Sequence, residues 1–327
     1  MTDRERRNRD ETARRASGSG RSRGRARSGK RSAGRDVSGI VLLDKPIAIS
    51  SNDVLQLVKR LYQARKAGHT GSLDRLASGL LPLCLGSATK LSGFLLNADK
   101  RYVATIRLGV KTATGDAEGE VVDTRPVPEL DEARVEQALA GFRGPIEQVP
   151  PMHSAIKLNG QRLYKLAHKG VTVERSARSV TIHRLDCLAR GADWLDVEVV
   201  CSKGTYIRTL AEDIGEALGC GAHVAALRRT GSGPFDASQM VSLEQLEALA
   251  EQGLDALDAV LLGAETALSD RPEVDLNESM AFYIRQGQPV LVAHAPTSGI
   301  VRLTQSGRFI GVGEIIDDGR VAPRRLL

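Results

Sequence analysis

The stretch Gly68-His69-Thr70-Gly71-Ser72-Leu73-Asp74-Arg75-Leu76-Ala77-Ser78-Gly79 is the most informative part of this chain. It places the carboxylate of Asp74 in a loop with three glycines, five residues after His69 and directly before an apolar run. Glycines at this density let the backbone approach a ligand closely or take a positive φ. Because loops on a rigid scaffold often carry function, the stretch indicates a functional loop. Taken alone, a single loop aspartate is more often a solvated turn former or a helix cap.

Charge is distributed unevenly along the 327 residues, of which 41% are hydrophobic and 26% are charged, as in a globular protein. Residues 1–35 contain twelve Arg, one Lys and four acidic residues, a net charge of +9, whereas the whole chain carries only +6. Residues 1–36 are almost free of apolar side chains, which predicts a disordered basic tail. Such a tail either attracts phosphates without sequence preference or acts only as a solubilising extension, and both interpretations remain open.

No run approaches eighteen apolar residues and no apolar segment follows the N-terminal charges, so we expect no membrane span and no signal peptide. The four cysteines, Cys84, Cys187, Cys201 and Cys220, lack metal-ligand spacing. They predict reduced thiols, no metal site and a cytoplasmic protein.

From residue 37 onward, helix and strand patterns alternate irregularly, which predicts an α+β fold with an antiparallel or mixed sheet and flanking helices. The apolar spacing of the last 58 residues predicts short strands around several glycines, and hence a small β-rich module. The expected strands are 39–43, 102–108, 180–188 and 194–201, and the expected helices are 50–61, 89–96, 131–140 and 205–218, with further helices near 242–262.

Two motifs resemble those of TruB-type tRNA pseudouridine synthases. The first is the Asp74 stretch, whose match continues through Leu80-Leu81-Pro82-Leu83-Cys84-Leu85-Gly86-Ser87-Ala88-Thr89-Lys90, and the second is Lys203-Gly204-Thr205-Tyr206-Ile207-Arg208-Thr209. The resemblance covers the chain from about residue 39 to its end. It implies a pseudouridine-synthase-like catalytic domain at 37–268 and a PUA-like RNA-binding module at 269–327.

The resemblance implies that Asp74 is the catalytic nucleophile and that Arg208 pairs with it. The residues give Arg208 an independent hint, because a cation in the first turn of a helix beside free N–H groups makes an anion site. An arginine within about 4–6 Å would lower the pKa of Asp74 by roughly one to three units and keep it ionised.

Four further roles are implied by the resemblance alone. Tyr102, in Lys100-Arg101-Tyr102, matches a tyrosine that stacks on the target base, and Tyr206 matches a second base-contacting tyrosine. His69 matches a histidine that helps to open the T-loop, and Leu227 matches a residue that lines the uracil pocket. Without the resemblance, each is more typical of an ordinary core or loop position. The adjacent Arg228 and Arg229 are expected to meet phosphates.

The segment at about 148–178 resembles the RNA-clasping insertion of the family, and its basic residues would neutralise phosphates, although a solvated basic surface gives the same pattern. These residues are Lys157, Arg162, Lys165, His168, Lys169, Arg175 and Arg178.

Three positions depart from the family pattern. Arg75 stands where proline is usual, which removes a constraint on φ and adds a charge beside Asp74. Ser78 replaces a common threonine. Ala48 replaces the usual glycine in the segment Asp44 to Ser51, which argues against a positive φ there.

The resemblance implies isomerisation of uridine to pseudouridine at position 55 in the T-loop of tRNA. Nothing is oxidised, hydrolysed or phosphorylated overall in that reaction, so no cofactor is expected, and a monomer is the default expectation. The attack position of Asp74 (C1′, C6 or a proton on C2′) and the final base stay open, Tyr102 being a candidate for the latter. Two alternatives remain: a non-catalytic tRNA-binding or RNA-folding protein, and the catalytic subunit of a guide-RNA-directed pseudouridylase.

Overall fold

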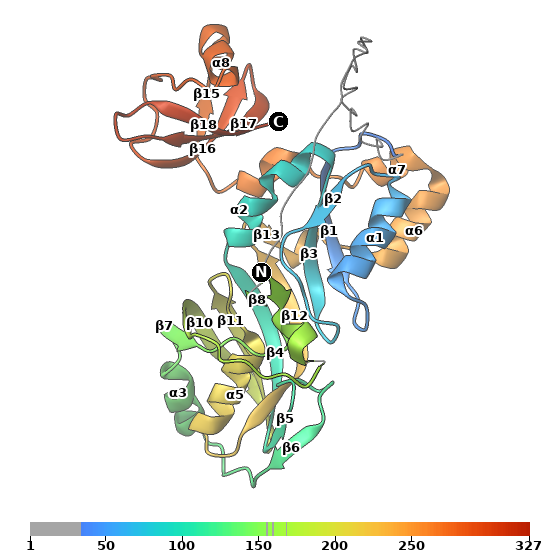
Figure 1. Ribbon diagram of the computed structural model, residues 1–327, viewed down its shortest axis with the longest axis vertical. Coiled ribbons are helices and arrows are strands. Elements are labelled where there is room, and N and C mark those ends of the chain that lie inside the picture. The colour runs from blue at the N-terminus through green and yellow to red at the C-terminus, as the bar shows by residue number, and fades with distance from the viewer. Residues whose placement is uncertain (1–33, 155, 159, 168) are drawn as a thin grey trace, which may run out of the picture. The chain divides into compact units, whose positions relative to one another are not determined.

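A ten-stranded mixed sheet forms the centre of the protein in the computed structural model, which describes residues 34–154, 156–158, 160–167 and 169–327. Most of the predicted basic tail (1–36) therefore lies outside the described residues. The main strand order is β14-β1-β3-β12-β4-β11-β10-β7, with β2 beside β3 and β13 beside β12 (Figure 1). The strands are β1 (Gly39–Lys45), β2 (Ala67–His69), β3 (Ser78–Leu85), β4 (Lys100–Leu108), β7 (Gly144–Gln148), β10 (Arg178–Arg190), β11 (Trp194–Cys201), β12 (Ala222–Ser232), β13 (Phe235–Asp236) and β14 (Val241–Ser242).

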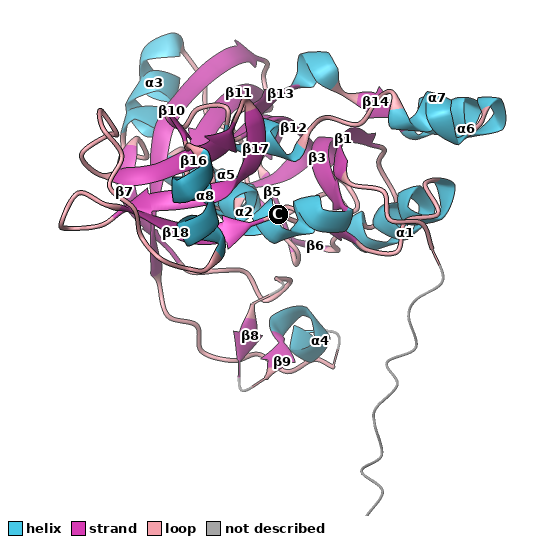
Figure 2. Cartoon of the chain, turned by 90° about the horizontal axis from the view of Figure 1, so that it is seen from above, coloured by secondary structure: helices cyan, strands magenta, loops and turns pink. Residues whose placement is uncertain are grey.

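The sheet is mixed because β1 pairs with β14, and β3 with β12, in parallel, whereas the other pairs are antiparallel. Helices flank it, as Figure 2 shows. The predicted α+β class with a mixed sheet and flanking helices is confirmed. The helices are α1 (Ser51–Leu61), α2 (Ser92–Asn97), α3 (Glu132–Ala140), α4 (Leu163–Ala167), α5 (Ile207–Ala217), α6 (Leu243–Gln252), α7 (Leu254–Asp258) and α8 (Glu278–Arg285), with 3₁₀ helices η1 (Gly86–Leu91), η2 (Ala237–Gln239) and η3 (Ala264–Leu268).

Helix α1 forms where the 3.6-residue apolar period predicted it. The Ser50 side chain accepts a hydrogen bond from the backbone N–H of Asp53 and so caps the first turn. Val54 and Val58 are fully buried on its inner face. Helix α5 begins at Ile207, two residues later than predicted, and Arg208 still lies in its first turn.

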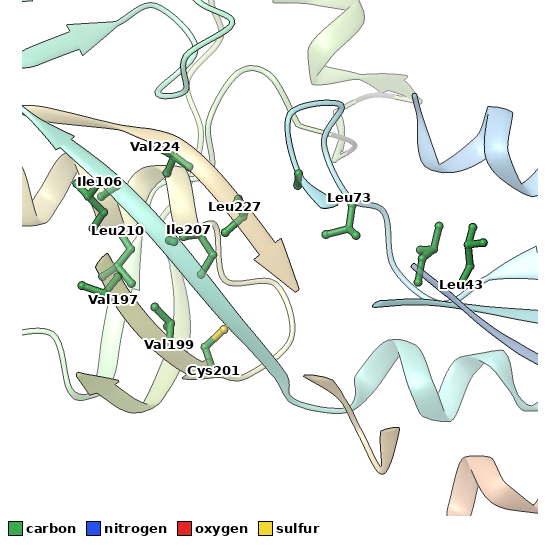
Figure 3. Close-up of a cluster of buried hydrophobic side chains, with 14 of the residues drawn as sticks. Leu43, Leu73, Ile106, Val197, Val199, Cys201, Ile207, Leu210, Val224 and Leu227 are labelled. Carbon is green, nitrogen blue, oxygen red and sulfur yellow. The ribbon is translucent and has the colours of Figure 1, made fainter. Parts of the chain in front are cut away.

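Strands β3 and β12 are the two central elements that the sequence patterns did not predict. In β3, Leu81 and Leu83 belong to the larger apolar cluster, whereas Leu80 and Cys84 belong to a second cluster. Because both faces are buried, β3 has the continuous apolar sequence of an internal strand instead of an alternating one. Figure 3 shows part of the larger cluster, with Leu227 of β12 close to Ile207.

The C-terminal module is a four-stranded sheet in the order β15-β16-β17-β18, together with helix α8. Val274, Ile284, Val301 and Leu303 are among the residues of its own apolar core. The predicted β-rich C-terminal module is confirmed. Its strands are β15 (Glu273–Asp275), β16 (Gly299–Gln305), β17 (Arg308–Ile315) and β18 (Val321–Leu326).

Two small hairpins are inserted into the main chain path, β5 (Val110–Thr112) with β6 (Val121–Thr124), and β8 (Lys157–Leu158) with β9 (Gln161–Arg162). The second hairpin and α4 stand apart from the sheet in Figure 2. His168 and the side chains of Lys157 and Arg162, named above as basic residues of the insertion, lie outside the described residues. Among the helices of the described ranges, none is both long and apolar enough to span a membrane.

Candidate active site

Asp74 lies on the loop between β2 and β3, and the sheet and helix α1 hold this loop at several points. The N–H of Thr70 donates to the carbonyl of Pro82 at 3.2 Å. The N–H of Leu73 donates to Oγ of Ser51 at 2.8 Å, and the same hydroxyl donates back to the carbonyl of Leu73 at 3.0 Å. The side chain of Asp74 nevertheless remains 45% exposed, so a fixed backbone presents an accessible carboxylate.

Arg208 lies directly against that carboxylate: its Nε is 3.0 Å from Oδ2 of Asp74, and its side chain is only 6% exposed. The two terminal nitrogens of the guanidinium are held by other parts of the chain. One terminal nitrogen donates to the carbonyl of Thr114 at 2.9 Å and lies 3.4 Å from Oδ2 of Asp116, while the other donates to the carbonyl of His153 at 2.8 Å. The predicted contact between Asp74 and Arg208 is therefore present.

The net effect on the pKa of Asp74 differs from the prediction. Surrounding protein raises the pKa of Asp74 above its usual value by desolvation, and Arg208 is the strongest influence that lowers it. The nearby charge of Asp116 adds to the increase. The expected lowering by Arg208 is present, but desolvation, which the expectation left out, outweighs it, so the net pKa of Asp74 is raised.

Two tyrosines are coupled electrostatically to Asp74. Tyr102 is half-buried on β4, and desolvation raises the pKa of its hydroxyl, while Arg229 opposes the increase. The half-buried Tyr206 directly precedes α5, and desolvation raises its pKa as well. The charge of Asp74 contributes to both shifts. The buried Gln148 fixes the Tyr206 backbone, because its amide accepts from the N–H at 3.0 Å and donates to the carbonyl at 3.3 Å.

His69 and Leu227 differ in their surroundings. His69 ends β2, and its Nδ1 is buried without a hydrogen-bond partner within the described residues. Desolvation and the charge of Arg229 lower the pKa of His69, which favours the neutral imidazole. Leu227 is 9% exposed and belongs to the larger apolar core, so it offers little surface in this structure.

The turn after β1 contacts the Asp74 loop. Lys45 is fully buried, and its Nζ donates to the carbonyls of Pro46 and Ile49 at 2.7 and 2.8 Å. Desolvation lowers the pKa of Lys45 to about 8, and the charge of Asp74 acts in the opposite direction. The N–H of Ala48 donates to the carbonyl of Arg75 at 2.8 Å, and Ala48 has a φ of 66°. The expectation that alanine excludes a positive φ here is wrong.

The sequence patterns did not predict that four further residues belong to the surroundings of Asp74: Lys45, Asp116, Gln148 and Arg229. Asp116 is the most accessible to prediction, because the Thr- and Gly-rich run between Thr112 and Gly119 is typical of a tight turn. Arg229 was expected to meet phosphates but is 1% exposed, which places it inside the protein. Arg228 instead forms a bidentate contact with the carboxylate of Asp44, at 3.0 and 2.7 Å.

Within the described ranges, no group of three or more His, Cys, Asp or Glu side chains is arranged to hold a metal ion. All four cysteines are free, and burial raises the pKa of Cys84 to about 12 and that of Cys201 to about 11. These thiols are therefore protonated at neutral pH and poor metal ligands.

Comparison with known proteins agrees with the motifs. Residues 59–207 match the model of the TruB family pseudouridylate synthase N-terminal domain, residues 208–269 that of the tRNA pseudouridylate synthase B C-terminal domain, and residues 272–327 that of the pseudouridine synthase II TruB C-terminal domain.

Full-length relatives and a solved structure extend this match. The tRNA pseudouridine synthase B of Nitrosococcus oceani is 62% identical over 299 residues, which cover 91% of this chain and 97% of that protein. The enzyme of the same name from Ectopseudomonas mendocina is 57% identical, over 90% and 96% of the two chains. A chain in the crystal structure of a Cbf5-Nop10-Gar1 complex superposes with a TM-score of 0.70 at 26% identity, over 88% of this chain and 84% of that chain. The chain therefore belongs to the TruB family of pseudouridylate synthases.

Proposed function

We propose that this chain is an isomerase that converts uridine to pseudouridine in tRNA, at position 55 of the T-loop. The observation that carries the proposal is the accessible Asp74 carboxylate, 3.0 Å from Nε of the buried Arg208. Both residues stand in motifs that define the resemblance, and relatives 62% and 57% identical are named tRNA pseudouridine synthase B.

Access to the target base requires that the uridine leave its stack. Proteins read RNA sequence mostly in loops, where bases can be turned outward. Turning a base out of its stack costs a few kcal/mol. Stacking on an aromatic ring returns about 1–3 kcal/mol per base, and in this proposal Tyr102 supplies that ring. Tyr206, His69 and Leu227 complete the binding site for the target nucleotide.

Asp74 then assists cleavage of the C1′–N1 bond in its ionised form, and Arg208 favours that form against the desolvation of the site. The freed uracil rotates while bound and rejoins C1′ through C5. The proton on C5 is lost, N1 gains one, and substrate and product have the same composition. The isomerisation consumes no cofactor, because no electrons or groups are exchanged with a second substrate.

The remaining parts of the chain have roles in RNA binding in the same proposal. Residues 37–268 form the catalytic domain, and residues 269–327 form a PUA-like module. The insertion at about 148–178 contacts phosphates, and the exposed Lys165, Lys169 and Arg178 are suited to this contact. The T-arm of tRNA is the bound element, and the enzyme acts as a cytoplasmic monomer.

The proposal is tested with a tRNA transcript that carries tritium at C5 of its uridines, since formation of pseudouridine releases the C5 hydrogen. The purified chain is expected to release one equivalent from the T-loop uridine without any added guide RNA, and a transcript with cytidine at position 55 removes that equivalent. Asp74→Asn is expected to bind the transcript and release none, whereas Asp36→Asn, an exposed carboxylate, serves as the matched control. A wild-type chain that binds tRNA and releases no tritium contradicts the proposal, and a requirement for guide RNA supports the guide-directed alternative.

A further inference from the structure

Arg229 is a buried cation without a carboxylate partner. Its side chain is among the largest that are fully buried, at 1% exposed, and no ion pair involves it within the described ranges. Its Nε donates to the carbonyl of Leu80 at 2.6 Å, and one terminal nitrogen donates to the carbonyl of Gly71 at 3.2 Å. An apolar side chain of similar volume would cost the fold less than a buried charge does. Stability alone therefore does not account for this arginine.

The contacts of Arg229 join three parts of the site. Leu80 lies on β3, and Gly71 lies three residues before Asp74 on its loop. Tyr102 is the cross-strand partner of Arg229 on β4, so the two side chains are neighbours on one face of the sheet. A planar guanidinium can serve several acceptors at fixed angles, which a lysine ammonium on a flexible stem cannot reproduce.

The backbone next to Arg229 allows strands β3 and β12 to lie unusually close together. Gly79 pairs with Arg229 in the short parallel register between β3 and β12. Gly79 has a φ of 98°, and a Cβ at that position would lie 2.3 Å from the carbonyl oxygen of Arg229. Only glycine allows β12 to lie this near to β3, and this spacing brings the guanidinium within reach of the Asp74 loop.

We propose that Arg229 is a positioning residue, whose guanidinium fixes the Asp74 loop and the ring of Tyr102 relative to each other for the isomerisation. The inference rests on the proposed function and adds to it a residue that acts from inside the protein. Because the side chain is buried, it acts on the geometry of the reacting groups and leaves tRNA affinity unchanged.

Single-turnover kinetics with the tritiated transcript separates this role from its alternatives. In Arg229→Met, the rate constant is expected to fall about 100-fold, the scale of a displacement near 1 Å, while the transcript concentration for half-maximal rate stays within about threefold of wild type. Arg229→Lys keeps the positive charge and a single donor nitrogen, without the planar guanidinium. Its rate constant is expected to be about tenfold higher than that of Arg229→Met.

Arg143→Met is the matched control. Arg143 also donates two side-chain hydrogen bonds to the backbone, both to the carbonyl of Leu185 on β10, three strands away from β12 in the sheet order. Unlike Arg229, it has a carboxylate partner, Glu136. The rate constant of Arg143→Met is expected to stay within about twofold of wild type. The comparison is made at temperatures where circular dichroism shows that all variants are folded.

Three outcomes overturn the inference. One is a wild-type rate constant in folded Arg229→Met. Another is a raised half-maximal concentration with an unchanged rate constant, which indicates a phosphate contact. The third is an equal loss in Arg143→Met, which indicates general destabilisation. An inactive wild-type chain in the same assay contradicts the proposed function instead, so the two failures are distinguishable. If Arg229→Met does not fold, the Arg229→Lys variant carries the test, and a wild-type rate constant there has the same meaning.

Discussion

Asp116 and Arg208 form an ion pair in which both side chains are buried, 5% and 6% exposed, with 3.4 Å between Oδ2 and the nearest guanidinium nitrogen. Breaking such a pair by removing one partner leaves an uncompensated charge and costs about 3–5 kcal/mol. The pair thus holds the arginine in place while its Nε remains directed to Asp74.

Replacing Arg208 should move the acid limb of activity to higher pH. In the proposed mechanism Asp74 acts in its ionised form, desolvation already raises its pKa, and Arg208 is the main influence that lowers it. In Arg208→Met the pKa of Asp74 should therefore rise further. The pH profile of kcat/KM should show a greater loss at pH 6 than at pH 8. Profiles that differ only by a constant factor contradict this account.

Replacing Asp116 should move the acid limb in the opposite direction. The negative charge of Asp116 raises the pKa of Asp74, so Asp116→Asn should lower that pKa and extend activity to lower pH. The maximal rate should fall about tenfold, because Arg208 loses one of its anchors. The double variant Arg208→Met/Asp116→Asn should be more stable to urea than Arg208→Met alone. An acid limb that rises in Asp116→Asn is incompatible with the assigned electrostatics.

Lys45 should make the stability of the protein depend on pH in the alkaline range. Its pKa is lowered from 10.5 to about 8 in the folded chain, so between these values the unfolded chain binds more protons. The unfolding free energy of the wild type should therefore rise with pH from about 8 to 10.5, relative to Lys45→Met, by up to about 1.4 kcal/mol per pH unit. Urea unfolding at a series of pH values measures the difference. Lys100, whose pKa is also lowered to about 8, should show the same sign in Lys100→Met. A difference that is constant across the range contradicts the prediction.

Ala48→Gly should stabilise the chain. An L-residue at a φ of 66° costs roughly 1–2 kcal/mol, and the extra freedom of glycine in the unfolded chain offsets about half of this gain. The expected increase in unfolding free energy is therefore about 0.5–1 kcal/mol by urea denaturation. In Ala248→Gly, an exposed position of helix α6, the same change should instead destabilise by about 1 kcal/mol. Equal effects at the two positions rule out backbone strain at Ala48 as the cause.

Local patterns predicted much of the fold and the principal contact of the site. Helix α1 has a clear apolar period and a serine cap, and the alternation in β11 shows directly in its burial. Asp74 and Arg208 were found through motifs, and the first-turn position of Arg208 gave a separate physical reason.

The features that the sequence did not predict are those whose environment depends on distant parts of the chain. Strand β3 is buried on both faces and contains Pro82, so it lacks both alternation and a favourable strand composition. Local sequence makes Arg229 look like a surface residue, because nothing local shows that β3 and the Asp74 loop supply acceptors around it. The pKa of Asp74 depends on desolvation by the assembled fold, which motif spacing does not report.

The two-residue parallel register between β3 and β12 is the junction of the main sheet. Asp74 precedes this junction on the side of β1 and β3, whereas Arg208, Asp116 and Tyr102 belong to segments associated with β12 and β4. A chain in which only one half has formed therefore cannot bring Asp74 and Arg208 together. In the proposed mechanism turnover therefore requires complete assembly of the sheet, and an activity assay during refolding would time the joining of its halves.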